Sequence, residues 1–349
     1  MTTDRISRLQ TSIEPGQFFY VTNLINIRYL TGFTGSNAAL LVSDSNAVLA
    51  TDSRYEIQAQ EQMPDLQIAI GRNFSDLLLG NVPKAEVLVE GSSLSLNSFQ
   101  SMTAALEHKF TSTSGVVEQL RVVKDDSEIL LIKAACEIAT QAFLDVIQSI
   151  AIGQSERTIR DTLERRMRDL GADDVAFDSI VASGTNSAIP HHEPTDRKVQ
   201  AGDFLKIDFG AKLAGYHSDC TRTVVVGKPS DWQVDLHVAV TQAQLAGRSA
   251  IRSDVQFKDV EQAASQSLSD SGYREFFTHG LGHGVGLEIH EDPFFGRVEE
   301  AKIAPNTVVT IEPGAYLKDM GGVRVEDTIV VNSQGYQNLT DLPYELLEL

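Results

Sequence analysis

"DFLKIDFGAKLAGYHSDCTRTVVVG", residues 203–227, has the character of two strands that flank the short segment "AKLAG". Opposed residues of an antiparallel hairpin have a constant index sum, so a turn centred at Leu213-Ala214 places Asp208 opposite Asp219 on one face of the sheet. Two like charges that face each other directly destabilise a sheet. This hairpin therefore indicates that something positive compensates the two acids.

A second strand–turn–strand unit lies further along the chain, in "TVVTIEPGAYL" and "GGVRVEDTIVV". A bend centred at Asp319 opposes Glu312 and Glu326, and Arg324 points to the same face because it lies two residues before Glu326. A single acid pair is more often a solvated surface or an error of register, but two such hairpins are harder to explain in that way. The repetition suggests an internal duplication.

The segment between the two hairpins, "HGLGHGVGLEIHE" (279–291), contains three histidines and four glycines. It matches neither a phosphate-binding loop, which ends in Lys-Ser or Lys-Thr, nor the H-E-x-x-H helix of zinc proteases. His283 can join the four acids as a nitrogen ligand, and the flanking glycines let the backbone come close to a metal. Four carboxylates and one imidazole suit a pair of divalent ions. The candidate ligands are Asp208, Asp219, His283, Glu312 and Glu326.

The composition limits the classes of function. The chain has 349 residues, a length typical of two domains, and a net charge of -19, which disfavours binding to nucleic acid or to an anionic membrane. The polar start "MTTDRISRLQ" does not resemble a signal peptide, and the sequence has no run of eighteen apolar residues. The two cysteines form no metal or disulfide pattern. We therefore expect a cytoplasmic protein.

The pattern of the chain changes near residue 120. Before it, short apolar runs alternate with turn residues and indicate a small α/β domain without a cluster of catalytic residue types. After it comes a long amphipathic helix that starts near Asp126, with Ser127 as the expected N-cap, followed by a second helix from Ser155. Two further helices, near 232–251 and 257–271, interrupt short strands. We predict domains at residues 1–122 and 123–349.

The ordered set of candidate ligands resembles that of the dinuclear metallopeptidases with the "pita-bread" fold, which include methionine aminopeptidase, aminopeptidase P and prolidase. The surrounding segments "IDFG", "SDCTRT", "GHGVGLEIHE", "IEPG" and "VRVED" are similar too. "YLTGFTGSNAALLV" and "TDSRY" resemble the creatinase-like N-terminal domain of the Xaa-Pro peptidases, which methionine aminopeptidases lack. The resemblance implies an α/β N-terminal domain and an α+β pita-bread catalytic domain with an antiparallel sheet.

The resemblance also implies roles for the ligands. Asp208 chelates one ion, Asp219 and Glu326 bridge the two ions, and His283 and Glu312 complete the second. A hydroxide held between the metals attacks the scissile carbonyl, and Glu312 takes and returns the proton. Mn²⁺ suits this oxygen-rich set, while Co²⁺ or Zn²⁺ are possible by affinity.

Further residues gain roles from the same resemblance. His191 occupies the family's "PH" position and contacts the substrate, and His290 stabilises the oxyanion. Arg324 orients a metal-bound carboxylate. Three residues are weaker candidates: Tyr316 in the same neighbourhood, His279 near the substrate, and His192, which we expect to be solvated.

The implied activity is hydrolysis of the bond between an N-terminal residue and proline, a substrate that needs a dedicated pocket because proline lacks an amide N–H and has a fixed φ. We expect an Xaa-Pro aminopeptidase, since "YLTGFTGSNAALLV" and "PTDR" are more similar to aminopeptidase P. The alternative is an Xaa-Pro dipeptidase, in which Arg197, Arg297 or Arg324 could bind the proline carboxylate.

Two other classes share the fold but do without the metals: creatinase-like amidinohydrolases and non-enzymatic binding modules. The intact ligand set disfavours both. We expect a proline-containing peptide as substrate and a homodimer as the assembly.

Overall fold

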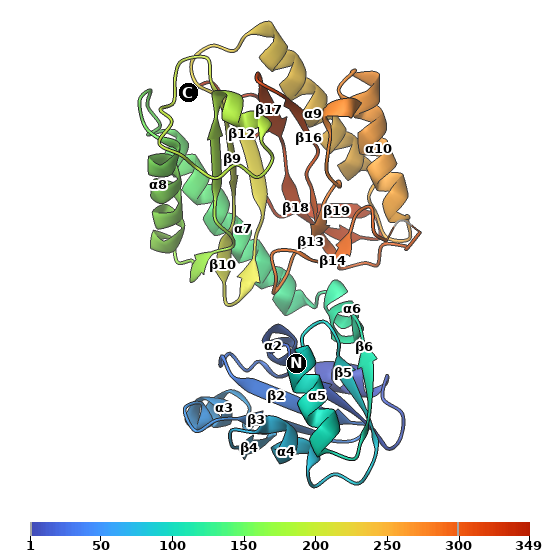
Figure 1. Ribbon diagram of the computed structural model, residues 1–349. Coiled ribbons are helices and arrows are strands. Elements are labelled where there is room, and N and C mark those ends of the chain that lie inside the picture. The colour runs from blue at the N-terminus through green and yellow to red at the C-terminus, as the bar shows by residue number, and fades with distance from the viewer. Residues whose placement is uncertain (1, 299) are drawn as a thin grey trace. The chain divides into compact units, whose positions relative to one another are not determined.

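The computed structural model describes residues 2–298 and 300–349 and divides the chain into two compact units (Figure 1). The first ends at Arg121 and the second runs over Val122–Leu349. The boundary predicted from the sequence is at residue 122. Within the described residues, no helix combines the length and the apolar character needed to cross a membrane.

The N-terminal unit is built on a six-stranded sheet with the order β4-β3-β2-β1-β5-β6. Strand β2 is antiparallel to both of its neighbours, and the remaining pairs are parallel. The elements are α1 (Thr2–Gln10), β1 (Gln17–Val21), α2 (Leu24–Thr31), β2 (Ala38–Ser43), β3 (Ala47–Thr51), α3 (Glu56–Gln62), β4 (Gln67–Ile70), α4 (Phe74–Leu79), β5 (Glu86–Glu90), α5 (Leu96–Ala105), β6 (Lys109–Thr113) and α6 (Val116–Val122).

The C-terminal unit consists of short antiparallel strands and four longer helices. Its helices are α7 (Asp126–Ile147), α8 (Glu156–Asp169), α9 (Asp231–Ala250) and α10 (Phe257–Asp270), with 3₁₀ turns η1 (Gly184–Ala188) and η2 (Arg274–Phe276). Its strands are β7 (Asp174–Val175), β8 (Ile180–Ser183), β9 (Phe204–Phe209), β10 (Ala211–Leu213), β11 (Tyr216–His217), β12 (Cys220–Val225), β13 (His283–Gly284), β14 (Glu291–Phe294), β15 (Val308–Ile311), β16 (Gly314–Leu317), β17 (Gly321–Arg324), β18 (Asp327–Asn332) and β19 (Gly335–Asn338).

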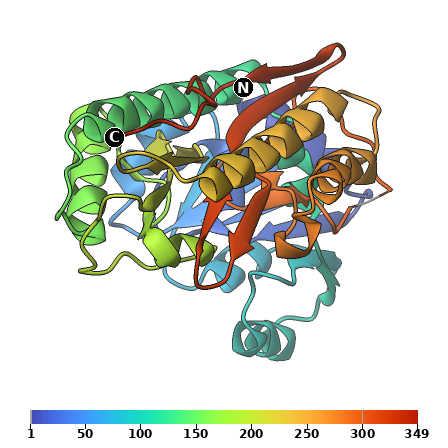
Figure 2. The ribbon, with the colours of Figure 1, turned by 90° about the horizontal axis from the view of Figure 1, so that it is seen from above.

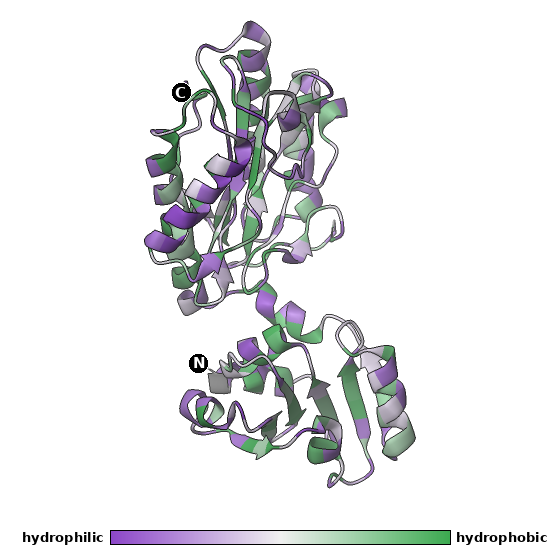
Figure 3. Ribbon diagram, turned by 60° about the vertical axis from the view of Figure 1, so that its left-hand side comes forward, coloured by the Kyte–Doolittle hydropathy of each residue, from purple (hydrophilic) through white to green (hydrophobic). Residues whose placement is uncertain are grey.

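The helices of this unit form two pairs that cover different strands. Helices α7 and α8 contact each other (Figure 2). They pack on the β12-β9-β8 sheet, where Phe143 stacks on Phe209 with ring centroids 5.1 Å apart. Helix α9 packs on strands β15, β16, β17 and β19, and α10 packs against α9. Hydrophobic residues dominate the strands in Figure 3, whereas the helices carry hydrophilic residues as well. The fold class expected from the sequence is confirmed.

One helix start differs from the prediction. Helix α7 is capped by Asp125, not by Ser127: the Asp125 side chain accepts from the backbone N–H of Glu128, and the Glu128 side chain accepts from the backbone N–H of Asp125. This reciprocal capping box satisfies two backbone donors, which Ser127 could not do from inside the first turn. The Ser127 hydroxyl instead donates to Asp125.

The two acid-bearing hairpins differ in how well their register could be predicted. The second has the predicted register, with Gly314 opposite Arg324 and Ile311 opposite Asp327. In the first, Asp208 lies opposite Thr221 rather than Asp219. The turn is centred on Ala214-Gly215, both with positive φ, as a type I′ turn requires. A shift of two positions keeps each side chain on its face, so Asp208 and Asp219 remain on the same side.

Candidate metal centre

All five candidate ligands line one cavity of about 880 Å³ in the C-terminal unit. They lie at the ends of strands or where one strand pairing gives way to the next. Asp208 is near the end of β9, Asp219 lies between β11 and β12, and His283 begins β13. Glu312 and Glu326 lie between the β15–β18 pairing and the β16–β17 pairing. Segments far apart in sequence thus bring the five candidate ligands to one place.

His283 faces the acids with one nitrogen. Its Nε2 lies 3.5 Å from Asp219 Oδ2 and 3.4 Å from Glu312 Oε1. Its Nδ1 donates to the Gly284 carbonyl at 3.0 Å, which leaves Nε2 with a free lone pair when the ring is neutral. One ligand atom each of Asp219, His283 and Glu326 lies within 4.8 Å of the others. This arrangement is the one that a metal-binding histidine adopts.

The acids of the cavity repel one another. Burial, and then the charges of Asp208 and Glu312, raise the pKa of Asp219 well above its ordinary value. Burial, and then the charges of Asp219 and Glu312, raise the pKa of Glu326 in the same way. Burial also raises the pKa of Glu312. The protein therefore holds these carboxylates together at an electrostatic cost.

Arg324 compensates only part of this negative charge. Its guanidinium donates to Asp208 Oδ2, to the Thr221 hydroxyl at 3.0 Å and to the Tyr316 hydroxyl at 3.0 Å. The second oxygen of Asp208, Oδ1, is buried and has no hydrogen-bond partner among the described residues. An orphaned carboxylate oxygen beside three further acids and an imidazole fits the ligation of divalent cations.

The glycines beside His283 have a role in packing. A side chain at Gly282 would collide with the backbone carbonyl of Thr310, and one at Gly284 would collide with the carbonyl of Asp292. Glycine is therefore required where β13 passes close to the backbone of its neighbours. It serves the packing of the strand that carries His283.

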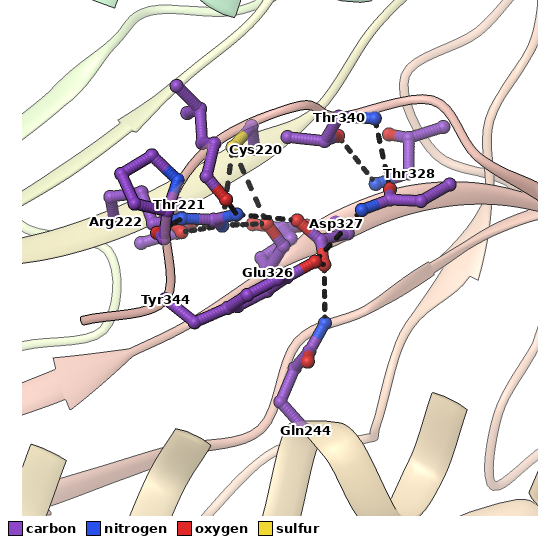
Figure 4. A network of polar contacts seen from close by, with 12 residues as sticks. Cys220, Thr221, Arg222, Gln244, Glu326, Asp327, Thr328, Thr340 and Tyr344 are labelled. Carbon is purple, nitrogen blue, oxygen red and sulfur yellow. Dashed lines mark hydrogen bonds and ion pairs between the residues drawn. The ribbon is translucent and has the colours of Figure 1, made fainter. Parts of the chain in front are cut away.

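Asp327, the residue that follows Glu326, takes part in a network of polar contacts (Figure 4). The Asp327 carboxylate accepts hydrogen bonds from Arg222 Nη2 at 2.8 Å, Gln244 Nε2 at 2.7 Å and the Tyr344 hydroxyl at 2.7 Å. Arg222 Nη1 also donates to the Glu326 carbonyl at 2.7 Å. This network fixes the backbone from which the Glu326 side chain extends into the cavity.

The four other histidines named from the sequence also line the cavity: His191, His192, His279 and His290. The rings of His283 and His290 are 4.4 Å apart between centroids. Burial, and then the nearby His283, lower the pKa of His290 to about 4, so its ring is neutral at neutral pH. His279 hydrogen-bonds the Tyr316 hydroxyl at 2.9 Å, and Tyr316 is buried and joins His279 to Arg324.

The expectation for His192 is wrong, because this residue is not solvated. Only 8% of it is exposed, and its Nε2 lies 2.8 Å from Oε2 of Glu156. The sequence does not reveal Glu156, a fully buried acid in the first turn of α8. It does not reveal His217 either, whose backbone N–H and ring Nδ1 both donate to the Gly286 carbonyl. No local pattern marks either residue, since their partners are distant in sequence.

The three arginines considered for a substrate carboxylate differ in their surroundings. Arg197 is bonded to Asp203 through two nitrogens, and Arg324 is bonded to Asp208. Arg297 is exposed, lines the cavity and has no ion-pair partner among the described residues. Its guanidinium carbon lies 4.4 Å from the centroid of the Phe294 ring.

Comparison with known proteins agrees with this geometry. Residues 131–333 match the model of metallopeptidase family M24, and residues 5–123 match the creatinase/prolidase N-terminal domain. The chain therefore belongs to metallopeptidase family M24 and is a metal-dependent peptidase.

Individual relatives narrow the class to the Xaa-Pro peptidases of this family. The chain is 32% identical to an Xaa-Pro dipeptidase of Pyrococcus furiosus over 94% of each protein. The solved structure of an Xaa-Pro dipeptidase from Bacillus anthracis has a TM-score of 0.96, with 36% identity and full coverage of both chains. An X-Pro aminopeptidase from Thermotoga maritima MSB8 has a TM-score of 0.91 and 38% identity, covering 98% of this chain and all of the other.

Proposed function

We propose that this peptidase is an Xaa-Pro dipeptidase, which hydrolyses the bond between the two residues of an Xaa-Pro dipeptide. The sequence motifs favour the aminopeptidase, but the similarity to the dipeptidases of Pyrococcus furiosus and Bacillus anthracis supports the alternative. A dipeptidase has to recognise the carboxylate of proline, which lies one residue beyond the scissile bond. An aminopeptidase has to leave that position open for the rest of the peptide.

Arg297 is the observation that carries this proposal. The ring of Phe294 lies 6.3 Å from the ring of His283 between centroids, and the Arg297 guanidinium stacks on the same Phe294 ring. A single aromatic ring, that of Phe294, therefore separates the Arg297 guanidinium from His283, a candidate metal ligand. A guanidinium without an ion-pair partner can bind a carboxylate through two parallel hydrogen bonds. Arg197 and Arg324 are already committed to carboxylates of the protein.

The four acids and the imidazole of the cavity would hold two divalent ions, with Asp219 and Glu326 shared between them. Once bound, such ions polarise the scissile carbonyl and lower the pKa of water. Mn²⁺ suits the four carboxylates, and Co²⁺ or Zn²⁺ would also bind by affinity order.

The protein's own side chains supply the proton transfer and the binding of substrate. Glu312 would accept a proton and return it to the leaving nitrogen, a role that its raised pKa favours. The neutral His290 would donate a hydrogen bond to the developing oxyanion. His191 would contact the substrate beside the scissile bond, and Arg324 would orient Asp208.

The test compares Xaa-Pro with Xaa-Pro-Xaa substrates on one preparation of the metal-loaded enzyme. We expect cleavage of the dipeptide and little release of the first residue from longer peptides. Efficient cleavage of tripeptides would overturn the proposal in favour of the aminopeptidase. That second candidate is supported by the similarity to the Thermotoga maritima X-Pro aminopeptidase.

A further inference from the structure

The loop that carries His191 fixes this residue through its backbone, not through its side chain. The residue is exposed at the cavity, and its ring makes no hydrogen bond to any described residue. Its position therefore depends on the backbone on either side. The preceding residue, Pro190, and the following residue, His192, are both fixed by buried charged groups of the C-terminal unit.

The Glu156 carboxylate binds the loop on the His192 side. Its Oε1 accepts hydrogen bonds from the backbone N–H of Ser183 at 2.7 Å, the Ser183 hydroxyl at 2.8 Å and Asn186 Nδ2 at 3.0 Å. Its Oε2 accepts from His192 Nε2 at 2.8 Å, the backbone N–H of Thr195 at 2.9 Å and the Thr195 hydroxyl at 2.7 Å. One carboxylate thus joins both ends of the segment 183–195.

Two cations bind the loop on the Pro190 side. Lys206 is fully buried, and its Nζ donates to the carbonyls of Ile189 at 2.6 Å and Pro190 at 3.2 Å. Arg324 Nη1 donates to the same Pro190 carbonyl at 3.3 Å. The peptide groups that precede His191 are therefore tied to β9 and β17, which also carry the metal-site residues Asp208 and Arg324.

A helix-stabilising role alone does not account for Glu156. An acid in the first turn of a helix is favourable because it faces the positive end of the helix dipole, but an exposed acid serves this purpose equally well. Glu156 has no exposed surface, and its six hydrogen-bond donors all belong to the loop. Burial opposes ionisation, yet these donors, His192 foremost, lower the pKa of Glu156 to about 2, so it is an anion at neutral pH.

We propose that Glu156 is a positioning residue for catalysis, which acts through the loop 183–195 to hold His191 against the substrate. The inference rests on the role given to His191 in the proposed function. Because small displacements of a catalytic group are costly, a loosened loop would lower kcat by about 10²-fold. The metal ligands lie on other elements and would keep their ions.

The substitution Glu156→Gln tests the inference at nearly constant shape. Either placement of the amide nitrogen puts N–H groups against a backbone N–H, of Ser183 or of Thr195, which cannot reverse its direction. The measurement is a double-mutant cycle of E156Q and H191A, with kcat and KM for an Xaa-Pro dipeptide and with metal content determined for each Mn²⁺-loaded protein. The matched control is Glu137→Gln, an exposed acid on α7, which should behave as wild type.

We expect E156Q to lose about 10²-fold in kcat with KM and metal content nearly unchanged, and to lose less than about threefold further in the H191A background. Equal losses in both backgrounds, or full activity of E156Q beside an impaired H191A, would overturn the inference alone. Full activity of H191A would overturn the role of His191 in the proposed function and this inference with it. If E156Q does not fold, Thr195→Val, which removes one donor to Oε2, decides in the same cycle.

Discussion

Glu326 and Asp327 are neighbours, both are buried, and their surroundings are opposite. Adjacent residues of an extended chain point to opposite sides, so the two carboxylates face different regions of the C-terminal unit. Asp327 accepts hydrogen bonds from Arg222, Gln244 and Tyr344. Glu326 faces the carboxylates of the cavity. Burial raises the pKa of Glu326, and the charges of these carboxylates raise it further.

The difference shows where a buried acid finds its compensation. Removing an acid from water is costly unless hydrogen bonds or opposite charges replace the lost hydration. The chain itself supplies this replacement to Asp327. Glu326 and Glu312 each accept one hydroxyl hydrogen bond, from Thr221 and Thr310. Otherwise the chain supplies mainly like charges to Glu326, Asp219 and Glu312, with Arg324 bonded to Asp208. The compensation on this side is therefore expected to come from bound cations.

Removing an acid shared by both ions should have the largest effect. Asp219→Ala or Glu326→Ala should lose both ions and all measurable activity, because each is proposed to bridge the two metals. Metal analysis of the purified variants, together with a dipeptide assay, checks this result. If either variant bound two equivalents as wild type does, the assigned bridging roles would be wrong.

Loss of a histidine that acts on the substrate should leave metal binding by the acids of the cavity intact. His191→Ala and His290→Ala should each retain the ions but lower kcat by about 10²-fold or more, since each removes a contact made close to the reacting atoms. Steady-state kinetics on metal-loaded protein gives the answer. Unchanged kcat in both variants would make these histidines ordinary polar residues of the cavity wall.

Substitution of Arg297 should affect binding of a dipeptide more than its conversion. Arg297→Met keeps much of the contact with the Phe294 ring but removes the guanidinium, so KM should rise by about tenfold or more for the loss of a charged hydrogen bond. The same kinetic assay measures this change, with Arg252→Met, an exposed arginine that does not line the cavity, as the control. An unchanged KM would remove the main structural support for the dipeptidase.

The smallest expected effect is on the thermal stability of the metal-free protein, where Glu326 and Asp327 can be compared directly. Glu326→Gln removes a like charge from the cavity and should raise Tm, whereas Asp327→Asn weakens a compensated ion pair with Arg222 and should lower it. A change of about 1 kcal/mol corresponds to about 2–4 °C for a unit of this size. Thermal unfolding after chelation measures both signs. Shifts in the same direction would remove the distinction between the two acids.

The sequence predicts much of this site because the ligands lie on hairpins whose geometry follows simple rules. The second hairpin bends at Asp319, the centre predicted from the sequence, and opposed residues have a constant index sum on both sides of it. The register of Glu312 and Glu326 therefore follows from the position of the bend. In the first hairpin the centre of the turn was misplaced by one residue, because Gly215, with its positive φ, determines the turn. The period of two preserved the face in spite of this error.

The supporting residues could not be predicted from the sequence. Glu156 is 27 residues from Ser183 and 39 from Thr195, and nothing in its local sequence shows that α8 turns this acid inward. His192 was misjudged for the same reason, since its partner lies on another element. Tertiary contacts of this kind depend on how the helices pack, which neither periodicity nor a resemblance to a family specifies residue by residue.

The central claim is that cations compensate the acid-lined cavity, and the most direct test counts them. The wild-type protein would be stripped with a chelator, dialysed against Mn²⁺ and analysed for bound metal and dipeptidase activity. The account predicts no activity in the stripped protein, about two equivalents of Mn²⁺ per chain after dialysis, and recovery of activity together with the metal. Full activity in exhaustively metal-free protein, or a chain that binds no Mn²⁺, would contradict it.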